Sequence, residues 1–281
     1  MIPERLRWIA DFPGGAEWLG RLPQLVEECV EQWSLRVEEP YEYANVSLAL
    51  PAGDAVLKIS FPHQESEHEA AALEHWAGHG AVRLLAYDGE RNALLLERCV
   101  PGTSLLELPE REGYRQAARV VRKLGERPAQ PDHPFTPIAE TAAGWARELP
   151  ERWEAAGQPF ERELLGATVD ALRELPPTQG ELVVCHQDFH RGNALAAQRE
   201  PWLAIDPKPV VAEREFDTAA LIRDGPGDLA WRLDFLADEL GLEHERMRGW
   251  AIAHTVAWGF SEAEPRVYES QIDVARQLLR L

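Results

Sequence analysis

The sequence predicts an α+β protein with two lobes: an antiparallel β-sheet lobe over residues 1–97 and a mainly helical lobe over residues 98–281. The length of 281 residues exceeds the usual size of a single hydrophobic core, and the 45% hydrophobic content can fill two. Short apolar segments between turn residues dominate the first part of the chain, as in antiparallel sheets. After residue 110 the apolar residues recur with the period of a helix.

The first lobe is expected to begin with an amphipathic helix over residues 16–33, whose apolar residues lie largely on one side. A second helix is expected over residues 65–77, after Pro62. Apolar runs bounded by turn residues predict roughly five antiparallel strands, at residues 35–37, 46–50, 55–59, 82–87 and 93–97.

Lys58 is a candidate functional residue because it interrupts an apolar strand and is one of only three lysines in the chain. Burying a lysine is costly unless its charge is paired. In a lobe that binds ATP, a strand lysine grips the α- and β-phosphates and pairs with a glutamate from the following helix. Glu69, eleven residues later, is the expected partner, and Glu65, one turn earlier on the same face, is the reserve.

The segment after the last strand, residues 97–102, is expected to form the hinge between the lobes. Backbone groups of Glu97 and Cys99 are expected to meet the adenine edge, which needs one carbonyl and one N–H side by side. No G-x-x-x-x-G-K-[ST] motif occurs, which excludes P-loop kinases. No G-x-G-x-x-G loop precedes Lys58, so residues 43–47 are expected to cover the phosphates without glycines.

The second lobe is expected to be mainly helical, with helices at residues 110–127, 139–156, 160–175 and 218–223 and two more around Asp228–Glu239 and Trp250–Trp258. Residues 182–185 form an apolar strand that leads into a polar loop. Two short strands, at residues 194–197 and 202–205, are then joined by a polar turn. This hairpin returns the chain to the place where the polar loop ended.

Three side chains around that hairpin have the chemistry of phosphoryl transfer. Asp188 and Asn193 lie five apart on the polar loop, and Asp206 follows the hairpin. A single D-x-x-x-x-N pattern is usually an ordinary turn, but here a strand, H-x-D-x-x-x-x-N, a hairpin and an aspartate occur in order. Asp188 is the expected base for an acceptor hydroxyl, and Asn193 and Asp206 are the expected ligands of Mg²⁺.

The pattern His186-x-Asp188-x-x-x-x-Asn193 with Ile205-Asp206 resembles the catalytic loop and metal-binding strand end of aminoglycoside phosphotransferase-like kinases, distant relatives of protein kinases. A narrower resemblance is to the aminoglycoside/hydroxyurea antibiotic resistance kinase family, which includes streptomycin 6-phosphotransferases; it rests on residues 57–62, 95–102, 205–209 and 215–221. The resemblance covers most of the chain. It implies a protein-kinase-like fold, ATP and Mg²⁺ as cofactors, and a small, often cationic acceptor.

The net charge of −19 predicts repulsion of nucleic acids and anionic membranes and attraction of a cationic small molecule, although acidity also serves solubility alone. The three cysteines lack metal-ligand spacing and are expected to be small core residues. No apolar run is long enough to cross a membrane, and the N-terminus lacks the apolar stretch of a signal peptide. A cytoplasmic protein is therefore expected; a monomer is favoured, and the oligomeric state stays open.

Several polar residues allow both a structural and a functional interpretation. His186 is expected to brace the loop and His190 to pack against the metal-binding strand. Neither is expected to bind zinc, because further histidines at ligand spacing are lacking. Asp217 opens a predicted helix and is expected to support helix and loop. The acceptor pocket is assigned to acidic and aromatic residues near the end of the chain, namely Asp228, Trp258 and Glu262.

The sequence thus predicts a phosphotransferase that moves the γ-phosphate of ATP to a hydroxyl of a small cationic acceptor, such as the aminoglycoside streptomycin. One alternative is a housekeeping kinase for a sugar, an amino sugar such as glucosamine, or another metabolite on the same fold. Another class is a catalytically silent nucleotide-binding protein. The simultaneous presence of Lys58, Asp188, Asn193 and Asp206 speaks against that class.

Overall fold

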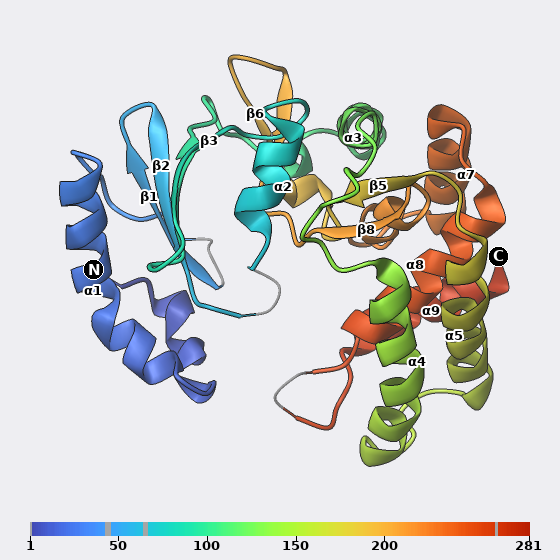
Figure 1. The fold of residues 1–281 in the computed structure, drawn as a ribbon. Helices are drawn as coiled ribbons and strands as arrows, with labels where there is room; N and C mark the ends of the chain where they lie inside the picture. Colours follow the sequence, from blue (N-terminus) through green and yellow to red (C-terminus); the bar gives the residue numbers. More distant parts are fainter. Residues whose placement is uncertain (1, 43–45, 64–66, 262–263) are drawn as a thin grey trace. The chain divides into compact units, whose positions relative to one another are not determined.

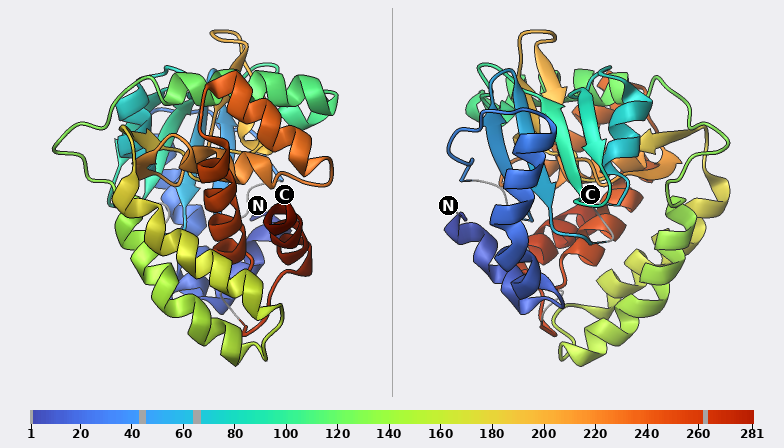
Figure 2. Two further views of the ribbon diagram at one scale, coloured as in Figure 1. Left: turned by 90° about the vertical axis from the view of Figure 1, so that its right-hand side faces the viewer. Right: turned by 60° about the vertical axis from the view of Figure 1, so that its left-hand side comes forward.

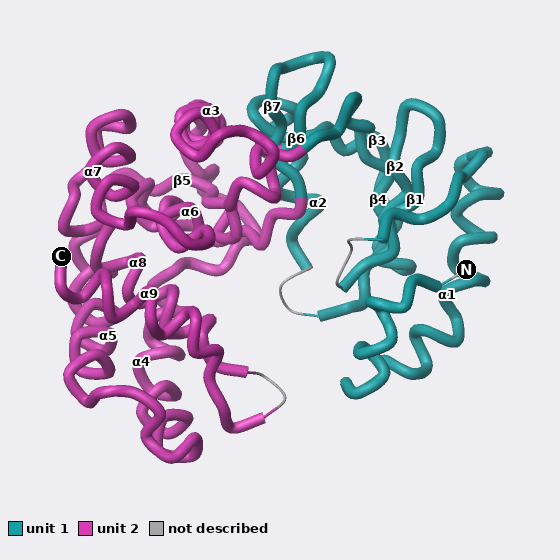
Figure 3. Tube along the Cα trace, turned by 180° about the vertical axis from the view of Figure 1, so that it is seen from behind, with its two compact units in different colours: residues 1–103, 195–205 teal, residues 104–194, 206–281 magenta. Residues whose placement is uncertain are grey.

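The computed structural model describes residues 2–42, 46–63, 67–261 and 264–281, and it divides into two compact units (Figure 3). Unit 1 comprises residues 1–103 and 195–205, and unit 2 comprises residues 104–194 and 206–281. The boundary expected after residue 97 stays a prediction. No helix of the described residues is long and apolar enough to span a membrane.

The sheet of unit 1 has four antiparallel strands in the order β1-β2-β4-β3 (Figure 1). These are β1 (Ser47–Ala52), β2 (Ala55–Ser60), β3 (Leu84–Asp88) and β4 (Ala93–Glu97). Gly53, with φ of +63°, lies in the tight turn between β1 and β2, a conformation that glycine adopts without strain. Because β2 is a central strand, both neighbouring strands hold its backbone.

The expected strand at residues 35–37 is wrong, because the sheet has four strands in the described residues. The chain nevertheless runs beside β1, where the N–H groups of Glu38 and Tyr41 donate to carbonyls of β1 at 2.8 and 2.9 Å. A regular ladder would also use residue 40, but Pro40 has no N–H to donate. The proline therefore keeps this segment from becoming a fifth strand.

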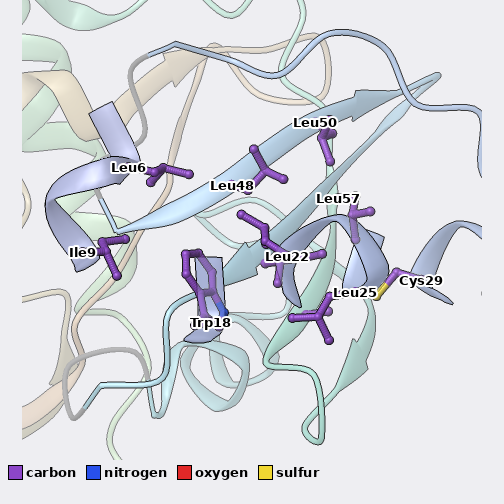
Figure 4. Packing of buried hydrophobic residues seen from close by; sticks show 11 residues of the cluster. Leu6, Ile9, Trp18, Leu22, Leu25, Cys29, Leu48, Leu50 and Leu57 are labelled. Carbon is purple, nitrogen blue, oxygen red and sulfur yellow. The ribbon is translucent and has the colours of Figure 1, made fainter. Parts of the chain in front are cut away.

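One face of the sheet is covered by η1 (Glu4–Asp11) and α1 (Gly15–Gln32), as seen in Figure 2. The helical period of α1 brings its apolar stripe onto β1 and β2, so that a continuous core forms between helix and sheet. Figure 4 shows this cluster; its buried members are Leu6, Ile9, Trp18, Leu22, Leu25, Cys29, Leu48, Leu50, Leu57, Ile59 and Ala93.

Unit 1 also contains α2 (Glu69–Trp76) and the hairpin of β6 (Ala194–Ala196) and β7 (Trp202–Ala204). Backbone hydrogen bonds join the hairpin to the rest of unit 1. The carbonyl of Ala204 accepts from the N–H of Val82 at 3.0 Å, and its N–H donates to the carbonyl of Gly80 at 2.8 Å. The polar turn of the hairpin carries Arg199, whose contacts are given below.

Unit 2 is mainly helical. Its helices are α3 (Glu110–Leu124), α4 (Ile138–Ala155), α5 (Arg162–Glu174), α6 (Ala219–Ile222), α7 (Leu229–Leu240), α8 (His244–Trp258) and α9 (Glu269–Arg280), with short 3₁₀ turns η3 (Leu105–Glu107), η4 (Pro176–Thr178), η5 (Arg191–Asn193) and η6 (Phe216–Thr218). Helices α4 and α5 lie side by side, and α8 packs against α5, α6 and α9 (Figure 2).

A two-stranded antiparallel sheet lies within unit 2, formed by β5 (Leu182–Cys185) and β8 (Val210–Glu213). Strand β8 was not expected from the sequence. All four residues of β8 are buried, and Val210, Ala212 and the strand β5 form a core with Trp250 of α8. This sheet anchors both ends of the segment from residue 186 to residue 209, which contains the polar loop.

Candidate active site

Lys58 and Glu69 form a buried ion pair within unit 1. The Nζ atom of Lys58 lies 2.6 Å from both carboxylate oxygens of Glu69, and the two side chains are 9% and 3% exposed. Lys58 extends from the central strand β2, and Glu69 is the first residue of α2. Charge-assisted bonds of this length in a dry site hold both groups firmly. The expected partner is thus the observed one, whereas Glu65 lies outside the described residues.

Glu97, at the end of β4, is held by Arg199 from the hairpin turn. Nε and Nη2 of Arg199 lie 2.9 Å from the carboxylate oxygens, and Arg199 also donates to the carbonyls of Gly78 and Ala81. Burial opposes ionisation of Glu97, but the hydrogen bonds from Arg199 and the Arg83 N–H outweigh it and lower the pKa. The start of the expected hinge is therefore fixed by a side-chain network.

Cys99, the other expected hinge residue, is partly buried and has a free thiol. Burial raises the pKa of this thiol to about 12, so the thiolate is not populated at neutral pH. Cys29 and Cys185 are fully buried free thiols, as expected for core residues. A contribution of Cys99 to nucleotide binding would come from its backbone.

Strand β5 leads directly into the catalytic loop, which we define as residues 186–193. The carbonyl of His186 accepts from the N–H of Asp188 at 2.8 Å and from the N–H of Lys208 at 3.1 Å. The side-chain amide of Asn193 donates to the carbonyl of Asp188 at 3.0 Å. These bonds close the loop on itself and fix the backbone of Asp188 from both directions.

A buried carboxylate supports the loop from below. Asp217 in η6 accepts from the N–H of Gln187 at 2.9 Å, at a position where Gln187 has φ of +66°. Burial raises the pKa of Asp217 to about 6, and hydrogen bonds from the Gln187 and His186 N–H groups act in the opposite direction. His190 caps η5 by accepting from the N–H of Gly192 at 3.0 Å. The left-handed backbone at Gln187 is thus stabilised by a specific partner.

Asn193 and Asp206 fit a magnesium site. The amide nitrogen of Asn193 is committed to a carbonyl, so its amide oxygen is the atom available as a metal ligand. Asp206 has φ of +60°, a left-handed conformation in which aspartate is more common than most residues. In the described parts of the chain no group of three His, Cys, Asp or Glu side chains suits a metal. Mg²⁺ does not need one, because it uses one or two carboxylates together with phosphates and water.

Asp188 contacts two cationic side chains of unit 2. Nζ of Lys208 lies 3.0 Å from Oδ2, and Nη2 of Arg223 lies 3.5 Å from Oδ1. Lys208 lies two residues beyond Asp206, and Arg223 follows α6. The Asp188 side chain is 13% exposed. The predicted base is therefore accessible to a small degree and is flanked by positive charge.

Trp258, the last residue of α8, lies against the same two cations. Its ring centre is 4.7 Å from Nζ of Lys208 and 5.2 Å from the guanidinium carbon of Arg223, and the ring stacks on His254 at 4.5 Å. His254 is fully buried; burial first, and then the charges of Arg223 and Lys208, keep its pKa well below the usual value. Trp258 therefore supports the cations beside Asp188 by cation–π contacts.

The remaining residues of the expected acceptor pocket have different positions. Asp228 is the N-cap of α7 and accepts from the N–H of Trp231 at 3.0 Å, so its carboxylate has a structural task. Glu262 lies outside the described residues. The assignment of Asp228, Trp258 and Glu262 to acceptor binding stays a prediction.

Sequence reasoning missed four charged residues around the loop. Arg223 contacts Asp188, while the next residue, Asp224, accepts from both the N–H and Nε of Arg191 at 3.0 and 2.8 Å. Two consecutive residues thus bind the two sides of the catalytic loop. Lys208 is the fourth. Two sequence signals pointed to Lys208, namely its rarity, since the chain has three lysines, and its place in residues 205–209, whereas the arginines are too numerous to stand out.

A family model described as aminoglycoside/hydroxyurea antibiotic resistance kinase matches residues 43–264. A hydroxyurea phosphotransferase of Kitasatospora aureofaciens is 37% identical over 94% of this chain and 81% of its own length. A streptomycin 6-kinase of Streptomyces griseus is 31% identical over 99% of this chain and 97% of its own length. The matched region includes Lys58, Glu69 and the catalytic loop.

Solved structures support the fold. A choline kinase from Streptococcus pneumoniae superposes with a TM-score of 0.66 at 11% identity, over 92% of this chain and 98% of that one. An aminoglycoside phosphotransferase superposes with a TM-score of 0.61 at 15% identity, over 92% and 98% of the two chains. At these identities the likeness is one of fold, and it confirms the predicted protein-kinase-like architecture.

Proposed function

Because this chain belongs to the aminoglycoside/hydroxyurea antibiotic resistance kinase family, we propose that it transfers the γ-phosphoryl group of ATP to a hydroxyl of a streptomycin-type aminoglycoside. The chain is a kinase, and its acceptor is the part that is proposed. The catalytic loop carries the proposal: Asp188 is held at its backbone by Asn193, and its carboxylate is partly exposed. A carboxylate so held is suited to orient a hydroxyl and accept its proton.

The proposed reaction assigns a task to each half of the candidate site. Lys58, kept in place by Glu69, binds the α- and β-phosphates of ATP. Backbone groups of Glu97 and Cys99 contact adenine. Asp188 accepts the proton of the acceptor hydroxyl while the new O–P bond forms and the bond to ADP breaks. Asn193 and Asp206 would hold Mg²⁺, which neutralises phosphate charge when bound.

The streptomycin-type acceptor is supported by charge and by relatives. The net charge of −19 attracts a polycation, and two streptomycin 6-kinases are 31% and 30% identical to this chain over 99% and 94% of its length. A second candidate is hydroxyurea, a small neutral acceptor, because a hydroxyurea phosphotransferase is 37% identical to the chain. The two acceptors differ in charge, so they depend differently on acidic pocket residues.

The test is ADP release from Mg-ATP with streptomycin, hydroxyurea, glucosamine and simple sugars as acceptors. We expect stimulation by streptomycin, and a product heavier by one phosphoryl group in mass spectrometry. Asp188→Asn is the control and should abolish the stimulation. Stimulation by hydroxyurea alone would replace the proposed acceptor, and stimulation by glucosamine or a sugar alone would assign a metabolite kinase. If no acceptor stimulated ADP release, the proposal would be abandoned.

We further propose that the enzyme works as a cytoplasmic monomer with Mg²⁺ as its metal. These finer points rest on the sequence and on the metal fit of Asn193 and Asp206. Light scattering during size-exclusion chromatography would detect a dimer. Loss of activity in EDTA, with recovery on added Mg²⁺, is the expected response to metal removal.

A further inference from the structure

The two cations beside Asp188 are bound unequally by its carboxylate. Lys208 and Arg223 approach different oxygens of Asp188, at 3.0 and 3.5 Å. The first distance is that of a good ion pair, whereas the second is at the outer limit of a hydrogen bond. Both cations are largely buried, with side chains 20% and 14% exposed. The lysine thus holds the carboxylate, and the arginine is only loosely engaged.

Arg223 is poorly satisfied on every side of its guanidinium group. Nη1 reaches Oε1 of Gln271 at 3.5 Å, again a long contact. Nε is buried and has no hydrogen-bond partner among the described residues. A buried guanidinium normally binds an anion with two short parallel bonds, and leaving its donors unsatisfied is costly. The Arg223 guanidinium therefore has donors that could bind an anion, but no carboxylate of the described residues lies within 3.5 Å of it except Asp188 at that distance.

The surroundings of Arg223 do not supply that anion. Asp224, the neighbouring carboxylate in the chain, is engaged by the backbone and side chain of Arg191. His254, which packs against Trp258 beneath the cations, is kept neutral by its burial and by the positive charge nearby. Trp258 contributes a ring face but no negative charge. Among the described residues, the only carboxylate in contact with Arg223 is thus Asp188, at 3.5 Å, which leaves room for a second anion that binds from outside.

We propose that Lys208 and Arg223 bind the phosphoryl group while it passes from ATP to the acceptor hydroxyl. This inference rests on the proposed function and names two further residues of the same site. When the acceptor O–P bond forms and the bond to the ADP oxygen breaks, negative charge lies on the equatorial phosphoryl oxygens, and the hydroxyl proton passes to Asp188. Lys208 and Arg223 then release the Asp188 carboxylate and bind the phosphoryl oxygens. Stabilising charge where it develops is what lowers the barrier.

The first test uses ADP, Mg²⁺ and aluminium fluoride, a planar mimic of the phosphoryl group in transfer. In the unmodified enzyme, aluminium fluoride should tighten ADP binding by roughly tenfold or more, because the mimic adds charge-assisted bonds. In Lys208→Met and Arg223→Met the tightening should disappear, while the Kd of ADP alone changes by less than about twofold. Lys208→Arg keeps the charge and should retain part of the tightening.

Two matched controls separate a local effect from a general loss of charge. Lys123→Met removes the one lysine outside the candidate site, in α3, and Arg147→Met removes an arginine whose side chain is 72% exposed. Both should show the tightening of the unmodified enzyme. Melting curves of all variants establish that they are folded. Equal tightening in Lys208→Met, Arg223→Met and the controls would overturn the proposal.

Asp188→Asn distinguishes phosphoryl binding from mere support of the base. If Lys208 and Arg223 only hold Asp188, removing its charge makes them dispensable, and Lys208→Met added to Asp188→Asn has no further effect on the mimic. If they bind the phosphoryl group, Asp188→Asn binds the mimic at least as tightly as the unmodified enzyme, because a competing anion is gone. Adding Lys208→Met should then abolish the tightening.

Turnover provides the second readout. With an acceptor that supports transfer, Lys208→Met and Arg223→Met should lower kcat by about 10²-fold and leave KM for ATP and acceptor near the original values. Absence of turnover in the unmodified enzyme would count against the proposed function, while the aluminium fluoride titration would still decide the present inference. Normal kcat in both variants would overturn the inference and leave the proposed function intact.

Discussion

The candidate residues of unit 1 and those of unit 2 differ in how tightly their charges are paired. In unit 1, Lys58 and Glu69 form a short, buried pair, with both carboxylate oxygens 2.6 Å from one ammonium nitrogen. In unit 2, Asp188 is shared between two cations at 3.0 and 3.5 Å, and one of them has a buried donor without a hydrogen bond in the described chain. The pair proposed to stay in place is thus held by short contacts, whereas the cations proposed to exchange partners during the reaction share one carboxylate.

The largest effect expected from this comparison is on turnover. Asp188→Asn should lower kcat by about 10³-fold, because general-base catalysis is lost, while the free energy of unfolding hardly changes. The asparagine keeps the shape of the side chain, and its amide oxygen can still accept a hydrogen bond from Lys208 or Arg223. Initial-rate kinetics and chemical denaturation on one preparation provide both numbers. A strong loss of stability would show that the Asp188 carboxylate supports the fold as much as the Lys58–Glu69 pair does.

The second largest effect is expected on the free energy of unfolding, for a substitution in unit 1. Lys58→Met leaves the buried Glu69 carboxylate without its partner and should lower the free energy of unfolding of the protein by about 3 kcal/mol. Lys208→Met should lower it by less than about 1 kcal/mol, since Asp188 keeps Arg223 and some exposure. Urea denaturation of the two variants gives the comparison directly. Equal losses of unfolding free energy in the two variants would show that the Lys58–Glu69 pair and the Asp188–Lys208 pair contribute equally to stability.

The support below the catalytic loop predicts a pH effect of intermediate size. Folding raises the pKa of Asp217 from 3.8 to about 6, so the carboxylic acid form is favoured in the folded state. Its contribution to stability is therefore complete below pH 3.8 and is lost as pH rises through 6. Over that window the unmodified protein should lose about 3 kcal/mol relative to Asp217→Asn. Denaturation of both at several pH values checks this, and parallel curves would contradict it.

The smallest expected effect concerns the proposed acceptor pocket. Asp228→Ala removes the N-cap of α7 and should lower the free energy of unfolding by about 1 kcal/mol. Asp228→Ser keeps a capping oxygen without the charge, so it should restore most of that stability. If the carboxylate also attracts a cationic acceptor, Asp228→Ser should raise KM for streptomycin severalfold and leave KM for hydroxyurea unchanged. An unchanged KM for streptomycin would restrict Asp228 to capping.

The sequence allowed prediction of the parts that depend on local pattern. Lys58 and Glu69 met as expected because a strand and the next helix are joined by a short segment, so spacing alone brings the pair together. The loop from Asp188 to Asn193 and the hairpin after it were recognisable from their order. In each case the relevant partners lie close in the sequence or in a known arrangement of motifs.

Long-range partners were not predictable in the same way. Arg223 reaches Asp188 only because α6 packs on α8 in the folded unit, and no periodicity in the sequence records that. Strand β8 was missed because Pro207 and Pro209 precede it, and prolines usually indicate irregular chain. The expected strand at residues 35–37 failed for a related reason, since Pro40 prevents regular pairing.

The β6–β7 hairpin has a consequence for the order in which the protein can form during synthesis. The backbone hydrogen bonds of Gly80 and Val82 to Ala204 lie within unit 1. Ala204, however, is synthesised about a hundred residues after Thr103, where the first segment of that unit ends. Arg199, which holds Glu97, is also translated late. Unit 1 therefore cannot be completed until the β6–β7 hairpin, which follows the catalytic loop, has been translated.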